Sequence, residues 1–116
     1  MSDKDIEKEI QAKGKTAPRV TPDHIESIIV GELYFTAADG VSTHPQADIV
    51  VREHPELALL TFCVLKLKNG FTVTGESACA SPENFDPEIG QKIARANAVQ
   101  KIWPLEGYLL KQRLSE

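Results

Sequence analysis

The clearest hydrophobic pattern in the chain consists of two strand-like runs at residues 57–68 and 71–80, separated by Asn69-Gly70. The first run is rich in β-branched, aromatic and aliphatic residues, and the second alternates Thr with Phe, Val and Gly. An Asn-Gly pair between such runs favours a type I′ turn, because both central residues need a positive φ. We therefore predict an antiparallel β-hairpin. A two-residue loop pairs Lys68 with Phe71, Lys66 with Val73 and Val64 with Gly75.

A helical pattern precedes the hairpin. Thr21 is a good N-cap, Pro22 suits the first turn, and Asp23 favours the positive end of the helix dipole. Apolar residues then recur at helical spacing, which predicts a helix that ends near Thr36. These apolar residues are Ile25, Ile28, Ile29 and Leu33, with Val30 and Tyr34 widening the stripe.

A second helical pattern follows the hairpin and begins at Asp86-Pro87, again an N-cap residue followed by proline. Its broad apolar stripe runs through Ile89, Ile93, Ala96, Val99, Ile102 and Trp103. Pro104 removes a backbone donor and clashes with the preceding turn, so we expect the helix to kink or break after Trp103. A second segment continues through Leu105, Tyr108, Leu109 and Leu114.

These patterns predict one α+β domain over residues 21–116, with an N-terminal helix, an antiparallel β-hairpin and a long C-terminal helix bent at Pro104. Residues 1–20 are expected to form a flexible charged tail, and residues 39–56 a loop with room for one helical turn. Because a two-stranded hairpin is marginally stable alone, and a small domain has a modest core, we expect the protein to be a homo-oligomer.

Charge and composition narrow the classes of function. The net charge is −4, the pI is about 5.4, and no Lys/Arg cluster is longer than a pair. This argues against binding along DNA, which needs several phosphate-neutralising cations, but allows a small anionic ligand. The N-terminus lacks the apolar core of a signal peptide, and no apolar run could span a bilayer, so we expect a protein of the host cytoplasm without membrane contact. Cys63 and Cys79 are then expected to be reduced thiols.

Residues that could carry catalysis or hold metal lack the spacing of established sites. The three histidines and two cysteines form no CxxC, HxxxH or HExxH motif. Ser77 lies outside a GxSxG elbow. The cluster of Glu83, Asp86 and Glu88 is explained by helix capping and the helix dipole. We therefore expect neither enzymatic activity nor a metal or cofactor.

One group of residues has the chemistry of a nucleotide site. Phe85 lies just before the last helix, Lys92, Arg95 and Lys101 follow on its turns, and Asn97 is surrounded by alanines that would let a ligand or another chain come close. An aromatic face, an amide and cations suit a base and its phosphates. Two structural interpretations remain open: Phe85 staples the helix to the hairpin, and Asn97 forms a hydrogen bond across a dimer.

Two segments, TPDHIESIIVGELYFTAADG and GESACASPENFDPEIGQKIARANAVQKIWPLEGYLL, resemble the small tailed-phage protein family catalogued as phage N-four gp-forty-nine / Sf-six gene-sixty-six. The resemblance covers roughly residues 20–112. The hairpin followed by a long helix also resembles the Thoeris anti-defence-one sponges. Those homo-oligomers hold glycosyl cyclic ADP-ribose, and in some cases cyclic oligonucleotides, without cleaving them. Their pockets lie between subunits, and the matching residues here are Phe85, Asn97, Arg95 and Arg113.

The resemblance implies a phage anti-defence protein that sequesters a nucleotide-derived signal of Thoeris or CBASS defence. Phe85 would stack on a base, Asn97 would form a hydrogen bond, and Arg95 with Lys92 would meet phosphate charge. The alternative is a host-takeover protein that binds and inhibits a bacterial protein. Its contact surface would be the exposed hairpin face or residues 103–108.

Overall fold

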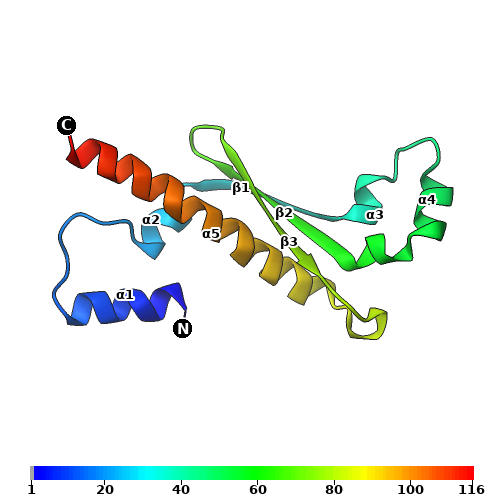
Figure 1. Cartoon of the computed structure of the whole chain (residues 1–116), viewed down its shortest axis with the longest axis horizontal. Coiled ribbons are helices and arrows are strands. Elements are labelled where there is room, and N and C mark those ends of the chain that lie inside the picture. Colours follow the sequence, from blue (N-terminus) through cyan, green and yellow to red (C-terminus); the bar gives the residue numbers. More distant parts are fainter. Residues whose placement is uncertain (1) are drawn as a thin grey trace.

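The computed structural model describes residues 2–116, which form an α+β fold with a three-stranded sheet and one long helix (Figure 1). The helices are α1 (Asp3–Ala12), α2 (Pro22–Ser27), α3 (Ala37–Gly40), α4 (Ala47–Glu53) and α5 (Pro87–Leu114), with short 3₁₀ turns η1 (Pro55–Leu59) and η2 (Pro82–Asn84). The strands are β1 (Ile29–Thr36), β2 (Leu60–Leu67) and β3 (Thr72–Ala78).

The sheet is antiparallel with the order β1-β2-β3, so β2 is central. Helix α5 lies across one face of the sheet and makes most of its contacts with β3 and β2 (Figure 1). The α+β class, the antiparallel hairpin of β2 and β3 and the long C-terminal helix are confirmed.

The predicted helix up to Thr36 is wrong beyond its first turns. Helix α2 begins as predicted, with the Thr21 side chain accepting from the His24 amide, but it ends at Ser27 and the chain continues as strand β1. The alternation that marks a strand is hidden here, because both faces of β1 carry apolar residues. The β-branched and aromatic residues of Ile29–Thr36 are nevertheless typical of a strand.

The predicted register of the hairpin is also wrong, by one residue. The loop consists of residues 68–70, because the Leu67 amide donates a hydrogen bond to the Phe71 carbonyl. Gly70, the last residue of the loop, has a φ of +90°. This is a loop with a glycine bulge rather than a type I′ turn. A slip of one residue exchanges the faces of a strand. The observed pairs are Lys66–Thr72, Leu65–Val73 and Cys63–Gly75.

Helix α5 begins as predicted, with the Asp86 carboxylate accepting from the amides of Glu88 and Ile89. It then continues as one helix through Pro104, so the helix does not break after Trp103.

The regions expected to lack structure carry short helices. Residues 1–20 include α1, which opens with a capping box between Ser2 and Asp5. Asp3 accepts hydrogen bonds from Gln100 and from the Trp103 indole, both on α5. Residues 39–56, expected as a loop, contain the end of α3 and all of α4. Cys63 and Cys79 are both free thiols, as expected.

The core lies between α5 and the sheet, and it depends on close approach of the helix to β3. A Cβ on Gly75 would lie 2.1 Å from the Ala94 carbonyl oxygen and 2.3 Å from the Ala98 amide nitrogen. Ala94 and Ala98 therefore face β3, and their small side chains leave room for the strand and not for a ligand. The buried core residues are Ile25, Cys63, Leu65, Leu67, Val73, Ala94, Ala98, Val99 and Ile102.

The molecule is elongated, with extents of 56 × 30 × 18 Å. Its radius of gyration is 18.0 Å, whereas a compact chain of this length has a value of about 13 Å. None of the helices in the described residues is long and apolar enough to span a bilayer.

Candidate functional site

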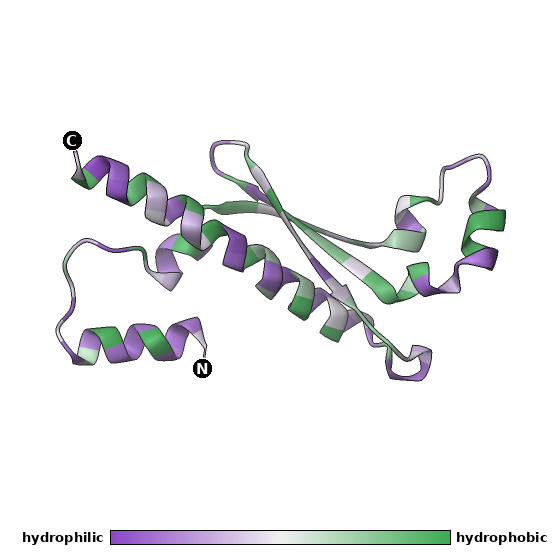
Figure 2. Cartoon of the chain, viewed as in Figure 1, coloured by the Kyte–Doolittle hydropathy of each residue, from purple (hydrophilic) through white to green (hydrophobic). Residues whose placement is uncertain are grey.

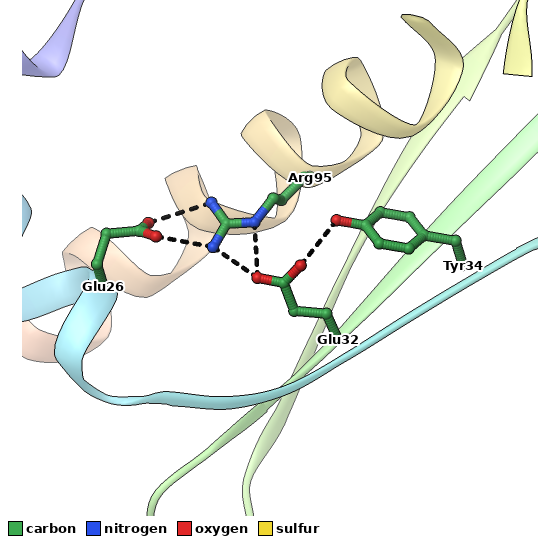
Figure 3. Close-up of polar contacts among 4 residues, drawn as sticks. All are labelled: Glu26, Glu32, Tyr34 and Arg95. Carbon is green, nitrogen blue, oxygen red and sulfur yellow. Dashed lines mark hydrogen bonds and ion pairs between the residues drawn. The ribbon is translucent and has the colours of Figure 1, made fainter. Parts of the chain in front are cut away.

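Arg95 lies at the centre of a polar cluster that joins three elements (Figure 3). Its guanidinium donates to both carboxylate oxygens of Glu26 on α2, at 2.8 and 3.1 Å. It also donates through Nε and a terminal nitrogen to one oxygen of Glu32 on β1, at 2.9 and 2.7 Å. The other oxygen of Glu32 accepts from the Tyr34 hydroxyl at 3.0 Å. The cluster fastens α5 to α2 and to the free edge of β1.

Each pKa in this cluster moves in the direction its contacts dictate. Hydrogen bonds from Arg95 lower the pKa of Glu32, and those to Glu26 and Glu32 raise the pKa of Arg95. Burial, followed by the bond to Glu32, raises the pKa of Tyr34 to about 12. Burial also raises the pKa of the Cys63 thiol. Arg95 is thus a permanent cation shared by two carboxylates, and a phosphate would have to displace one of them.

Asn97 and Lys92 lie elsewhere on α5. The Asn97 amide donates to the Glu76 carbonyl at 2.8 Å and so closes part of the outer edge of β3. Arg95 and Asn97 are two residues apart, so they project from nearly opposite sides of the helix. Lys92 is exposed and pairs with Glu88 one turn earlier, at 3.2 Å.

Phe85 borders a small cavity of about 120 Å³ at the start of α5. Ile89, Ile93 and Leu59 form much of its apolar wall. The Thr61 hydroxyl lies next to Gly90 in this region, is buried, and has no hydrogen-bond partner. Phe85 is half-buried between α5 and the end of β3, which agrees with a stapling role.

Arg113 borders a larger groove, of about 370 Å³, at the other end of α5. The groove lies between the hairpin loop, α2 and the C-terminal turns of α5. Lys68 and Arg113 bring two positive charges to it, and neither has an ion-pair partner within the described part of the chain. The Nε2 atom of His24 lies 2.6 Å from a carboxylate oxygen of Glu106 in the same groove. The other lining residues are Ile28, Leu67, Asn69 and Leu109.

One chain therefore does not assemble the five predicted residues into one site. From Pro87 to Arg113 the helix rises by about 39 Å, so Phe85 and Arg113 lie at opposite ends. The sequence did not indicate Lys68 and His24 as groove residues, because the groove forms only where the folded chain brings the hairpin loop and α2 to the end of α5. Among residues 2–116, no three His, Cys, Asp or Glu side chains gather as a metal site requires.

Comparison with known families adds one result. The model of the phage protein (N4 Gp49/phage Sf6 gene 66) family matches residues 20–114, which is most of the chain. The chain belongs to this family. The match includes the sheet, α5 and both ends of the helix, whereas α1 lies outside it. No curated protein sequence and no solved structure shows a significant match.

Proposed function

We propose that this phage-family protein binds and sequesters a small nucleotide-derived immune signal, a cyclic ADP-ribose isomer or a cyclic oligonucleotide, without cleaving it. The observation that carries the proposal is the groove at the C-terminal end of α5, where Lys68 and Arg113 both lie without an ion-pair partner among residues 2–116. Its volume of about 370 Å³ lies in the range of small-molecule sites. The resemblance of the sequence to the Thoeris anti-defence-one sponges supports the same class of ligand.

The attraction for an anion must come from these cations. The groove lies at the C-terminal end of α5, where the helix dipole favours positive charge and offers no free amides. Arg113 can meet a phosphate in two-point geometry, and Lys68 can meet it as a point charge. The Asn69 side-chain oxygen already accepts from the Phe71 amide, which leaves its NH₂ group as a donor.

A base would need a large aromatic partner, and the described lining of the groove contains no Phe, Tyr or Trp. Phe85 is the predicted stacking residue, but it lies at the far end of the helix of the same chain. We therefore propose that the complete site forms between subunits, where the Phe85 end of one copy meets the groove of another. Sequestration at such a site requires tight binding and no catalytic group.

Isothermal titration calorimetry with cyclic ADP-ribose isomers and cyclic dinucleotides tests the proposal. We expect heat with at least one of them in the wild type, and at least a tenfold loss of affinity in Lys68→Ala/Arg113→Ala. Arg52→Ala is the matched control, because Arg52 is an exposed cation on α4 outside the groove. Chromatography of the ligand released by heat should return it intact. No heat with any of these ligands would exclude this function, and equal affinity in both variants would exclude the groove as its site.

A second candidate, inhibition of a host protein, is favoured by one surface. Leu105, Tyr108 and Leu109 form an exposed apolar stripe on α5, and Tyr108 is 76% exposed. Of the segment 103–108 first considered, Trp103 is already engaged by α1. Stoichiometric capture of one host protein by the wild type, and its loss in Tyr108→Asp, would favour this candidate.

A further inference from the structure

The sheet has a second face that α5 does not cover. Residues that alternate with the core positions project from this side, which we call the open face. Its residues are Gly31, Leu33 and Phe35 on β1, Phe62, Val64 and Lys66 on β2, and Thr72, Thr74 and Glu76 on β3. Leu33 is 67% exposed, and Phe35, whose ring stacks on Phe62 at 5.4 Å, is 38% exposed. In Figure 2 much of β2 carries the green of hydrophobic residues.

We propose that the open face binds the open face of a second copy of this chain, around a two-fold axis that crosses the strands at Leu33, Val64 and Thr74. This inference goes beyond the proposed ligand and stands whether or not a nucleotide binds, because the proposed ligand site would use a separate contact between the ends of α5. A second copy is the expected occupant because the open face is complementary to itself in shape and in charge.

Complementarity of shape comes from the ends of β1. The two-fold axis would exchange the two outer rows of the face, which lie about 7 Å on either side of the central row. It would place Phe35 of one copy over Gly31 of the other. Gly31 has no side chain, so the surface beside the stem of Lys66 is hollow there, whereas Phe35 and Phe62 stand up as a stacked pair. The Phe35 ring of each copy would therefore meet the position of Gly31, where no side chain stands.

Complementarity of charge comes from β2 and β3. Lys66 lies in one outer row and the Phe62–Glu76 pair in the other, so the axis would place each lysine over Phe62 of the second copy. Glu76 of that copy would lie one strand away, within reach of the lysine side chain. Both side chains are exposed in the single chain, where Glu76 lies 4.0 Å from the Lys101 ammonium. Isologous interfaces require this reciprocal pattern, whereas a surface for an unrelated partner has no reason to show it.

The apolar content fits the same arrangement. Leu33 and Val64 are direct cross-strand partners at the centre of the face, and threonines border them on β3. Face-to-face packing of two such sheets at about 10 Å gives a core of the sandwich type. The result would be a four-layer dimer, helix–sheet–sheet–helix, in which the elongated protomers share a central core.

Sedimentation velocity of the full chain at micromolar concentration, across a dilution series, tests the interface. The wild type should be dimeric or an even multiple, and Leu33→Asp should raise the dissociation constant at least a hundredfold. Leu114→Asp is the matched control, because Leu114 is also exposed, at 56%, but lies at the end of α5. A monomeric wild type, or dissociation by Leu114→Asp and not by Leu33→Asp, would overturn the proposal.

Charge reversal provides a second test of the interface if circular dichroism shows that Leu33→Asp does not fold. Lys66→Glu and Glu76→Lys should each weaken the dimer at low salt by at least tenfold. The double variant should recover most of the lost affinity, because the pairs are rebuilt with opposite sense. Absence of recovery in a folded double variant would contradict the two-fold arrangement.

Discussion

The two faces of the sheet use similar residues in different ways. On the α5 side, Leu65 and Cys63 are completely buried, and the helix backbone sits directly on Gly75. On the open face, Leu33 and Phe35 are exposed although they belong to the same sheet. Apolar content alone therefore does not determine which face of the sheet is packed within the chain. The packed face is the one where the helix backbone comes close to the sheet, and the small residues Gly75, Ala94 and Ala98 allow this approach.

The largest effect should come from Gly75→Ala, which tests the packed face. The added Cβ would collide with backbone atoms of Ala94 and Ala98, which cannot turn aside as a side chain can. We expect a loss of more than about 4 kcal/mol in the free energy of unfolding, or failure to fold. Gly107→Ala is the control, since its Cβ would meet nothing within 4 Å, and it should stabilise α5 by about 0.5–1 kcal/mol. Urea denaturation of both variants gives the comparison, and a Gly75→Ala loss under 1 kcal/mol would contradict it.

Truncation of one large apolar residue on each face sharpens the contrast. Ile102 is completely buried against the sheet, so Ile102→Ala should cost about 2–5 kcal/mol. Leu33→Ala should cost less than about 0.5 kcal/mol in dilute protein, where the chain is monomeric. Its cost should rise with protein concentration, because only the dimer buries Leu33. Thermal unfolding over a dilution series measures the stability loss of both variants. If the loss in Leu33→Ala did not depend on protein concentration, the open face would not be the surface of self-association.

A prediction of intermediate size concerns the polar margin of the packed face. Arg95→Met should cost about 1–2 kcal/mol at neutral pH, a figure reduced for the partial exposure of both carboxylates. The folded-state pKa of Glu32 is below its ordinary value of 4.5, so its stabilisation is present above that pH. This stabilisation is lost as the pH falls through the folded-state pKa of Glu32. The free energies of unfolding of wild type and variant, measured by urea denaturation, should therefore converge in acid. A difference in stability that stays constant as the pH falls through that pKa would show that Glu32 is not the important partner of Arg95.

The smallest effect should be a gain. The Thr61 hydroxyl is buried on the packed face without a partner, and such a group costs free energy. Thr61→Val keeps the shape and removes the hydroxyl, so we expect stabilisation by about 1 kcal/mol. A destabilisation in the same urea titration would indicate that an ordered water or backbone group satisfies the hydroxyl.

The sequence predicted what local chemistry determines. The N-caps Thr21 and Asp86, each followed by proline, marked two helix starts, and the turn residues marked the hairpin. Strand β1 was misread because Ile25, Ile28 and Ile29 match helical spacing, while Leu33 and Phe35 lie on a face that is also apolar. The hairpin register depended on a bulge at Gly70 that Asn-Gly alone does not specify.

The predicted site residues show the same limit. Asn97 and Arg95 have the chemistry of a ligand site, but the chain uses one to bond the Glu76 carbonyl and the other to bind two carboxylates. Sequence position indicates which groups are available and not which internal partners reach them first. Phe85 and Arg113 lie at opposite ends of α5, so their joint role depends on contacts between copies.

Thiol cross-linking across the open face tests the central claim most directly. In a Cys79→Ser background, Leu33→Cys places a thiol on the proposed axis, and Thr72→Cys places one in an outer row, where the two copies would hold it about 13 Å apart. The backbones of the facing sheets would lie about 10 Å apart, which is too far for a disulfide, so a short bismaleimide is the reagent. It should convert Leu33→Cys to a covalent dimer and leave Thr72→Cys largely monomeric. Equal cross-linking of the two, or faster cross-linking of Thr72→Cys, would contradict the account.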